Sequence, residues 1–192
     1  MSTENETMKA QAVVFSQPKQ VSLQALELCS SGADDIEVNV LYSGISTGTE
    51  RLLWDGSMPA FPGMGYPLVP GYEAVGQVVA AGEHSPYQAG QRVFVPGAHC
   101  WGDGVHSLFG GSASRLVVPH HRVVSVDTID GPEAVLLALA ATAFILENIV
   151  NLLLREGGGF VRLFNRMFRS RQFHRLVLMP RETGVGLVFY IE

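Results

Sequence analysis

The stretch GYEAVGQVVAAG, residues 71–82, combines an apolar run with a glycine, Gly76, inside it. A run of Val and Ala of this length between glycines is typical of a buried strand. A glycine within a strand indicates a bulge or the close approach of another backbone segment. The stretch therefore predicts a strand within a sheet, and the segments on either side indicate what kind of sheet it is.

Short strand patterns precede and follow this stretch at regular intervals. Residues 36–44, IEVNVLYSG, place apolar and polar side chains in alternation, as a half-buried strand does. Turns rich in Gly and Pro separate the patterns, which favours a small, mostly antiparallel barrel or sandwich. Thr47 or Thr49 is expected to cap a short helix through residues 50–56, with Glu50 in its first turn. The further predicted strands are residues 11–15, 21–28, 89–97, 112–119 and 122–126.

A different pattern begins near residue 131. Pro132 and Glu133 suit the first turn of a helix, and nearly every residue from Ala134 to Leu146 is apolar. A helical segment from residue 134 to about residue 154 is long enough to span a bilayer. The polar residues within it favour a buried or interdomain helix instead, so contact with a membrane is not expected.

Charge changes sharply along the chain. Residues 1–142 carry six Lys and Arg against fourteen Asp and Glu, a net charge of −8, whereas residues 143–192 carry seven Arg against four Glu, a net charge of +3. The overall charge of −5 argues against nucleic acid as a partner. Two cysteines cannot form a disulfide scaffold, which favours a reducing compartment. Residues 1–10 are predicted to be a flexible polar leader rather than a secretory signal.

Five motifs, taken in order, resemble the catalytic domain of the medium-chain dehydrogenase/reductases, the family of alcohol dehydrogenase. The resemblance implies a GroES-like antiparallel β-barrel over residues 11–130, an interdomain helix over 131–154, and in the family a Rossmann domain after it. The motifs are VNVLYSGISTGTE (38–50), YPLVPGYEAVGQVVAAG (66–82), YQAGQRVFVPG (87–97), GGSASRLVVPHHRVVSV (110–126) and AVLLALAATA (134–143).

Within the family, SGISTGTER, PLVPGYEAVG and PGAHCWG most resemble the bacteriochlorophyll-synthesis branch. That resemblance implies a cytoplasmic enzyme that uses NAD to oxidise the 3-(1-hydroxyethyl) group of a bacteriochlorophyllide to acetyl. Assembly into a homo-oligomer is left open. The alternatives are another zinc-free sugar or polyol dehydrogenase, and a non-catalytic module that binds a tetrapyrrole or a protein partner.

The resemblance also implies the absence of zinc. Ser46 stands where zinc-dependent relatives have a ligand cysteine, and Tyr72 stands where they have a histidine, so that only Glu73 remains. A neutral hydroxyl and a phenol are poor zinc ligands. The four-cysteine lobe that holds a structural zinc is missing too, because Cys100 stands alone in that region.

Hydroxyl groups are therefore expected to replace the metal at the reacting centre. The resemblance gives catalytic roles to Ser46, Thr47, Tyr72 and Glu73, with Tyr72 donating to the alkoxide and Glu73 relaying or orienting. In the structural alternative, Ser46, Thr47 and Thr49 cap the helix, and Tyr72 is a core aromatic residue.

Other polar and aromatic residues are candidates for substrate and cofactor binding. Trp54, His99, Trp101 and His106 are expected to bind the substrate, the aromatic rings by stacking and the histidines as a base or as a contact to a tetrapyrrole magnesium. Thr47 and Thr142 are expected to contact the cofactor. Core packing and solvated loops are the alternatives.

The resemblance ends near residue 143. Residues 155–192 contain no G-x-G-x-x-G turn after a strand and are too few to build a nucleotide-binding domain. We expect a divergent tail in place of the Rossmann domain, either from truncation or a shifted reading frame, or as a genuine helical extension. The chain by itself is then expected to bind NAD weakly or not at all.

Overall fold

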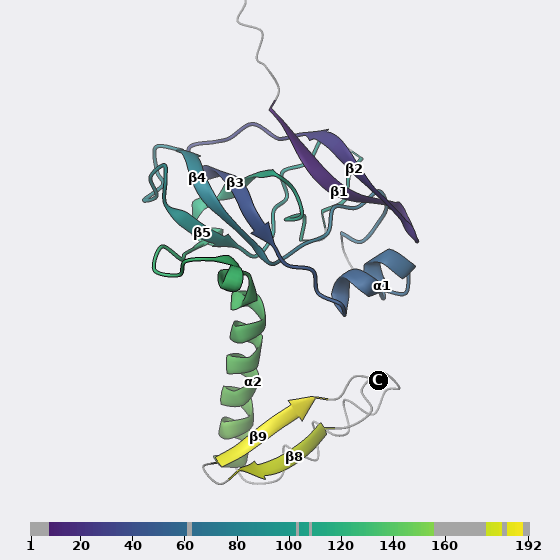
Figure 1. The fold of residues 1–192 in the computed structure, drawn as a ribbon, viewed down its shortest axis with the longest axis vertical. Helices are drawn as coiled ribbons and strands as arrows, with labels where there is room; N and C mark the ends of the chain where they lie inside the picture. The colour runs from purple at the N-terminus through teal and green to yellow at the C-terminus, as the bar shows by residue number, and fades with distance from the viewer. Residues whose placement is uncertain are drawn as a thin grey trace, which may run out of the picture. The chain divides into compact units, whose positions relative to one another are not determined.

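A computed structural model describes residues 8–60, 63–102, 104–107, 109–155, 176–181 and 184–189 (Figure 1). The chain forms two compact units, Met1–Ala138 and Leu139–Glu192. Antiparallel sheets dominate the first unit, and a long helix begins at its end. The predicted fold class, mostly β with antiparallel sheets, short helices and a C-terminal helix, is confirmed.

A five-stranded sheet forms the centre of the first unit, with the strand order β6-β3-β4-β5-β7 and antiparallel pairing throughout. β4, the strand predicted from residues 71–82, lies in the middle of this sheet. The strands are β3 (Asp35–Ser43), β4 (Ala74–Ala81), β5 (Arg92–Val95), β6 (Arg115–Pro119) and β7 (Val124–Ser125).

β1 (Lys9–Gln17) and β2 (Gln20–Glu27) form a separate antiparallel hairpin. Single bridges connect this hairpin to loops of the same unit, pairing Ala12 with Ala113, Phe15 with Leu68 and Leu28 with Trp101. On β1, buried and exposed residues alternate at first, whereas β2 is exposed almost throughout. Most of the hairpin's contribution to the core therefore comes from β1, with Leu26 of β2 packed against it.

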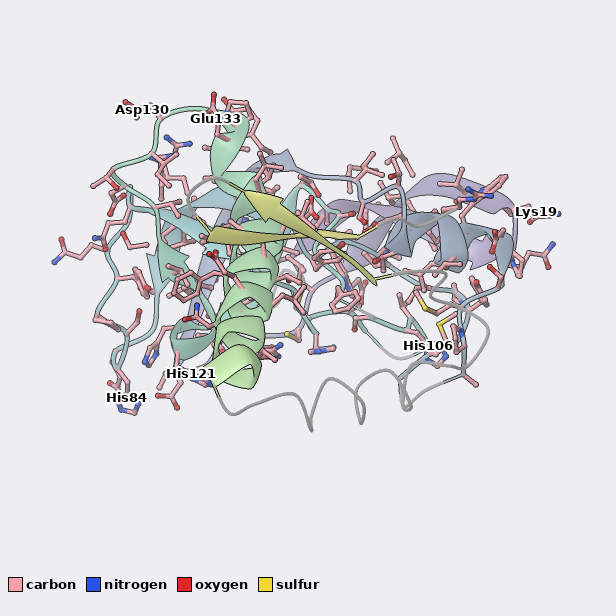
Figure 2. All side chains as sticks on the ribbon, turned by 90° about the horizontal axis from the view of Figure 1, so that it is seen from below. Lys19, His84, His106, His121, Asp130 and Glu133 are labelled. Atoms are coloured by element: carbon pink, nitrogen blue, oxygen red, sulfur yellow. The ribbon has the colours of Figure 1, made fainter. Side chains whose placement is uncertain are left out.

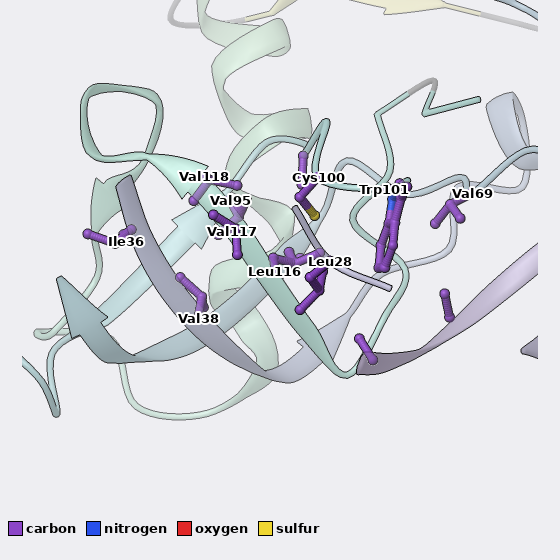
Figure 3. Packing of buried hydrophobic residues seen from close by; sticks show 14 of the residues in the cluster. Leu28, Ile36, Val38, Val69, Val95, Cys100, Trp101, Leu116, Val117 and Val118 are labelled. Carbon is purple, nitrogen blue, oxygen red and sulfur yellow. The ribbon is translucent and has the colours of Figure 1, made fainter. Parts of the chain in front are cut away.

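The main core lies between the central sheet, β1 and the loop around Trp101 (Figure 3). Ile36 and Val38 on β3 and Leu116 and Val118 on β6 are almost completely buried. On each strand these residues are two positions apart, so they point to the same face of the sheet. The period-two pattern of residues 36–44 thus identifies the core face of β3 correctly.

Gly76 lies where β3 and β4 approach closely. The register between the two strands shifts between Val40 and Tyr42, which pair with Gly76 and Val75. A Cβ atom at Gly76 would collide with the carbonyl oxygen of Asn39. The prediction of a bulge or close backbone approach at this glycine is confirmed.

Helices are short in the first unit. α1 (Thr49–Asp55) follows β3, and the 3-10 helix η1 (His120–Arg122) follows β6 directly. At His120, directly after β6, the backbone N–H donates to the carbonyl of Asp34 and the chain turns into η1.

A 3-10 helix, η2 (Pro132–Leu136), precedes the helix α2 (Leu137–Arg155). The predicted helix start near residue 131 is therefore a tighter helical turn, and the α-helix begins later. Apolar residues at this junction pack with Val75, Phe94, Val126 and Ala134 in a second, smaller core of the first unit.

The second unit contains most of α2 and an antiparallel hairpin of β8 (Leu176–Arg181) and β9 (Gly184–Phe189). Residues 132–149 are long and apolar enough to cross a membrane by length and composition. Only 6% of this window is buried, so the window does not have the burial of a core helix. Of the predicted tail, residues 156–175, 182–183 and 190–192 lie outside the described residues.

Candidate functional site

The loop from Gly44 to Thr49 connects β3 to α1 and places several hydroxyl groups near the start of the helix. The Ser46 hydroxyl accepts a hydrogen bond from the backbone N–H of Thr49 at 3.4 Å, and the Ser46 carbonyl accepts one from Glu50 at 3.1 Å. Gly48 occupies the N-cap position without a side-chain cap. Thr47 and Thr49 are therefore not the capping residues, and Ser46 takes over part of that role.

Tyr72 lies beside this loop. Its hydroxyl oxygen is 3.4 Å from the hydroxyl oxygen of Thr49, and either group can donate. Its ring packs against Phe109, with ring centroids 4.9 Å apart and planes inclined by 56°. Tyr72 is half-buried and does not belong to the buried core.

Glu73 precedes β4 and is almost completely buried, with a side chain only 4% exposed. Burial raises its pKa, and a hydrogen bond from the Tyr72 side chain partly offsets that rise. The Glu73 carbonyl accepts a hydrogen bond from Gly44 at 2.9 Å, which draws the end of β3 against this residue. One carboxylate oxygen, Oε1, has no hydrogen-bond partner.

Glu50 is a second buried carboxyl group, 7% exposed, in the first turn of α1. Burial raises its pKa and the nearby charge of Glu73 raises it further, whereas backbone N–H groups of Glu50 and Ser46 act in the opposite direction. Its Oε2 atom has no partner. The predicted place of Glu50 in the first turn of a short helix is confirmed, whereas its burial was not predicted.

A positional signal for the burial of Glu50 does exist in the sequence. Residues three apart lie on the same face of a helix, and Leu53, three residues after Glu50, is fully buried. The start of α1 is thus turned toward the interior. An acid at the start of a helix is usually explained by its favourable interaction with the helix dipole, so the sequence pattern that indicates its burial is easily overlooked.

The structure thus brings Ser46, Tyr72 and Glu73 together and adds Thr49 and Glu50. This arrangement combines neutral hydroxyl donors with buried carboxyl groups whose pKa values are raised, which suits hydrogen bonding to a substrate oxygen and proton transfer. Thr47 belongs to the same loop but has an exposed side chain.

The aromatic candidates occupy different environments. Trp54, at the end of α1, is 40% exposed, and Phe109 is 36% exposed. Trp101 is 9% exposed, and its indole N–H donates to the Gly110 carbonyl at 3.2 Å. Trp101 therefore follows the alternative of core packing, whereas Trp54 and Phe109 keep open ring surface.

The histidine candidates are exposed. His106 exchanges backbone hydrogen bonds with the 67–69 segment, donating to Pro67 and accepting from Val69, and its ring lies against Gly65. Figure 2 shows His106 well apart from His84 and His121. His99 is exposed in the same long loop as His106.

Metal ligands do not gather in the described part of the chain, where no three His, Cys, Asp or Glu residues lie close enough to hold an ion. Cys100 is buried, and burial raises its pKa to about 12. Such a thiol ionises poorly and would be a weak ligand. Thr142, the remaining cofactor candidate, is exposed on α2 in the second unit.

Comparisons with known proteins were consistent with one another. Residues 32–128 match the family described as the alcohol dehydrogenase GroES-like domain. A relative from Rhodobacter capsulatus named 2-desacetyl-2-hydroxyethyl bacteriochlorophyllide A dehydrogenase is 52% identical over 136 residues, covering 71% of this chain and 43% of the relative. A relative of the same name from Cereibacter sphaeroides is 49% identical over 140 residues, covering 71% and 44%.

A solved structure extends the comparison to the fold. A short chain alcohol dehydrogenase from E. coli CFT073, complexed with the cofactor NADH, matches with a TM-score of 0.53 and 23% identity. The match covers 67% of this chain and 42% of that one. The chain spans less than half the length of the curated relatives that it matches.

Proposed function

Because the chain belongs to the alcohol dehydrogenase GroES-like domain family, we propose that its first unit is the substrate-side domain of a zinc-independent alcohol dehydrogenase. The proposed reaction oxidises the 3-(1-hydroxyethyl) group of a bacteriochlorophyllide to an acetyl group. The names of two relatives at about half identity support this substrate. The observation that carries the chemistry is the contact between the hydroxyls of Thr49 and Tyr72, each followed in the chain by a buried carboxyl group, Glu50 and Glu73.

Oxidation of a secondary alcohol releases one proton from the hydroxyl group and one hydride from the carbon. In this proposal the hydroxyls of Ser46 and Tyr72 bind the substrate oxygen and stabilise the alkoxide as it forms. Glu73, which the Tyr72 side chain contacts, takes up the released proton.

The hydride acceptor in this family is a nicotinamide cofactor, and NAD is our proposal for this chain. The sheets in the described residues are all antiparallel, so these residues form no βαβ unit with a phosphate-binding turn. This part of the chain therefore does not fit the pyrophosphate side of a dinucleotide. Thr47 and Thr142 stay candidates for contacts to the nicotinamide side.

A large planar substrate needs open aromatic surface and a contact for its central metal. Trp54 and Phe109, both partly exposed, are our candidates for stacking on the macrocycle. His99 and His106 are candidates for the magnesium contact. Trp101 is left out of this role because its side chain is buried.

Pigment binding tests the proposal directly. Titration of the chain with a 3-(1-hydroxyethyl) bacteriochlorophyllide should shift the pigment absorbance, and Tyr72→Phe should weaken binding about tenfold, the worth of one hydrogen bond of about 1.4 kcal/mol. Tyr42→Phe is the control, because Tyr42 is exposed on β3. The pigment with a 3-vinyl group has no hydroxyl at this position. If wild type and Tyr72→Phe both bind it as tightly as they bind the 3-(1-hydroxyethyl) pigment, the assignment of Tyr72 to the substrate hydroxyl is wrong.

Zinc independence has its own test. Protein purified from zinc-containing medium should carry well under one zinc per chain, because Ser46 and Tyr72 offer only neutral oxygen atoms. Stoichiometric zinc that is lost in Glu73→Gln would contradict the proposal.

A non-catalytic pigment-binding module is the second candidate, favoured by the antiparallel pairing of the described strands. Pigment affinity that is unchanged by NAD would support this candidate over the enzyme. A cytoplasmic location and a homo-oligomer also remain proposals.

A further inference from the structure

β2 leaves one of its two edges unpaired within the described residues. It is the outer strand of the hairpin, and the strand that it pairs with is β1. The single bridges between this hairpin and the rest of the first unit start from Ala12 and Phe15 on β1 and from Leu28, which follows β2. Every residue of β2 except Leu26 is exposed. A row of backbone N–H and C=O groups along β2 is therefore open to another strand.

β2 lacks the features that usually protect an exposed edge. Natural edge strands commonly carry Lys or Pro, or a bulge that turns the edge away. Residues 20–26, QVSLQAL, contain neither a charged residue nor a proline, and the register against β1 is continuous from Val21 to Glu27. Val21 and Leu23 are 59% and 73% exposed and lie two positions apart, so they share a face of the strand. The strand thus has the composition of one that a neighbouring strand covers.

The sequence of β2 is complementary to itself in one antiparallel register. If a two-fold axis passes through Leu23, this residue lies opposite its own copy and Val21 lies opposite Ala25. In the same register, Lys19, the turn residue before β2, lies opposite Glu27, the last residue of the strand. Apolar side chains then meet on one face at the centre, and opposite charges meet at both ends.

Neighbouring registers lose this match. Moving the axis by one residue, to Ser22 or Gln24, still keeps the same face of both strands together. An axis at either position places both Lys19 and Glu27 opposite uncharged residues. Of these three registers, the one centred on Leu23 is the one that pairs the charges.

The two charges are available for pairing between copies. Within the described residues, neither Lys19 nor Glu27 takes part in an ion pair. The pKa of Asp55 is lowered mainly by its hydrogen bonds with Ser57, and Lys19 adds only the smallest contribution. Glu27 lies opposite Lys9 on β1. In that register each Glu27 lies between Lys9 of its own chain and Lys19 of the other copy, an alternation of charge that favours the pairing.

We propose that two copies of this chain associate through their β2 strands, antiparallel and centred on Leu23, so that the two hairpins form one four-stranded sheet. This dimer does not depend on the proposed function, and it gives a homo-oligomer a defined surface. One strand of 8 residues from each copy is a small contact, so the dimer is expected to exchange with the monomer.

Disulfide trapping detects this dimer at a single position, whatever other contacts the full chain makes. In a Cys29→Ser background, which removes the exposed native thiol, Leu23→Cys should oxidise to a covalent dimer. Residues directly opposite each other in antiparallel strands have Cα atoms about 4.5–5.5 Å apart, within reach of a disulfide. Val21→Cys is the matched control, because it lies on the same exposed face but about 13 Å along the strand from its own copy. Leu23→Cys should cross-link about tenfold faster than Val21→Cys, and equal rates would overturn the proposal.

A mixture of two variants tests the register. Chains with Val21→Cys and chains with Ala25→Cys should cross-link to each other, because these residues lie opposite one another when Leu23 is at the axis. Each variant alone should cross-link slowly. A mixture that reacts no faster than either variant alone would contradict this register.

The charges at the ends of the strand give a third measurement. Lys19→Glu, added to Leu23→Cys, should slow cross-linking about fivefold at low salt, because it faces Glu27 of the second copy. Arg122→Glu makes the same change in net charge at an exposed residue of η1 and should leave the rate unchanged. Equal slowing by both variants would mean that net charge rather than strand pairing controls the reaction, which rejects the proposal. Near-ultraviolet circular dichroism shows whether each variant is folded.

Discussion

Gly44 sits at the end of β3 in a position where a side chain has no room. A Cβ atom there would lie 2.9 Å from the Cβ of Glu73 and would also collide with the Glu73 carboxylate. Gly44→Ala should therefore destabilise the chain by about 1–3 kcal/mol, as overpacking of an interior usually does. Urea unfolding followed by circular dichroism measures this change.

Gly102→Ala is the matched control for Gly44→Ala. Nothing lies within 4 Å of a Cβ atom built at Gly102, and its backbone is outside the left-handed region. The control should change the free energy of unfolding by no more than about 0.5 kcal/mol. Equal changes in the free energy of unfolding for the two substitutions would show that Glu73 does not restrict the space for a side chain at residue 44.

The buried carboxyls also predict how stability depends on pH. The pKa values of Glu50 and Glu73 are raised in the folded chain, so folding favours their protonated forms. Their contribution is fully present below the unfolded-state pKa, about 4.3 for Glu, and is lost as pH rises through the raised folded values. The free energy of unfolding should therefore fall over that window, by at most about 1.4 kcal/mol per pH unit for each proton.

Urea unfolding at several pH values, in wild type and in Glu50→Gln, checks this dependence. The variant cannot titrate at residue 50 and should show a shallower fall with pH. Asp55 and Asp127 have lowered pKa values, so their effect has the opposite sign and appears at lower pH. If the free energy of unfolding falls with pH as steeply in Glu50→Gln as in wild type, Glu50 does not cause this pH dependence.

Single residues differ in how far the sequence predicts them. Ser46, Tyr72 and Glu73 could be selected in advance because they occupy positions where relatives carry metal ligands. The two tryptophans could not be told apart, because exposure depends on tertiary contacts: Trp101 pairs with Leu28 and donates to Gly110, while Trp54 ends a short helix. The burial of Glu50 was not predicted, because it comes from the orientation of α1.

Arg92, on β5, holds the turn that leads to η2. Its guanidinium group donates to the carbonyls of Ile129 at 2.8 Å and Gly131 at 3.1 Å, and it lies 3.5 Å from a carboxylate oxygen of Asp130. Figure 2 shows Asp130 in this turn and Glu133 in η2, which follows it. The side chain of Arg92 is only 18% exposed, so water competes weakly for these bonds.

Arg92→Met should lower the free energy of unfolding by about 1–3 kcal/mol, because the substitution keeps much of the side-chain volume and removes the hydrogen bonds from a charged donor. Arg122→Met is the control, since Arg122 is exposed on η1. Chemical denaturation compares the two variants. A loss of similar size in both would mean that the turn does not depend on Arg92.

Strands were the most predictable elements, because the alternation of apolar and polar residues reports directly which face is buried. The boundaries were less predictable. Residues 71–73 do not belong to β4, and β7 is limited to Val124–Ser125. The helix after Gly131 begins with a 3-10 turn, in which the junction residues pack under Val75 and Phe94, a tertiary contact that helix propensity does not encode.

The two units differ in how well each covers its own apolar surface. The first unit encloses three clusters of buried residues, whereas α2 exposes large apolar side chains at Leu139, Phe144, Ile145 and Ile149, between 41% and 68%. Exposed large apolar side chains on one helix promote association between molecules. The sequence predicted a long apolar helix here, but composition alone does not say whether such a helix is covered.

We therefore expect the full chain to associate through α2 and the double variant Phe144→Glu/Ile145→Lys to associate less, because it places two charges on the exposed surface. Sedimentation velocity over a range of concentrations measures the effect, which should appear as a shift toward the monomer. Ile45→Lys is the control: Ile45 is 78% exposed in the first unit, so a charge there tests exposure without touching α2. Because the first unit has its own core, both variants should keep its unfolding transition. If Ile45→Lys reduces association as much as the α2 variant does, the contact lies in the first unit and α2 is not its cause.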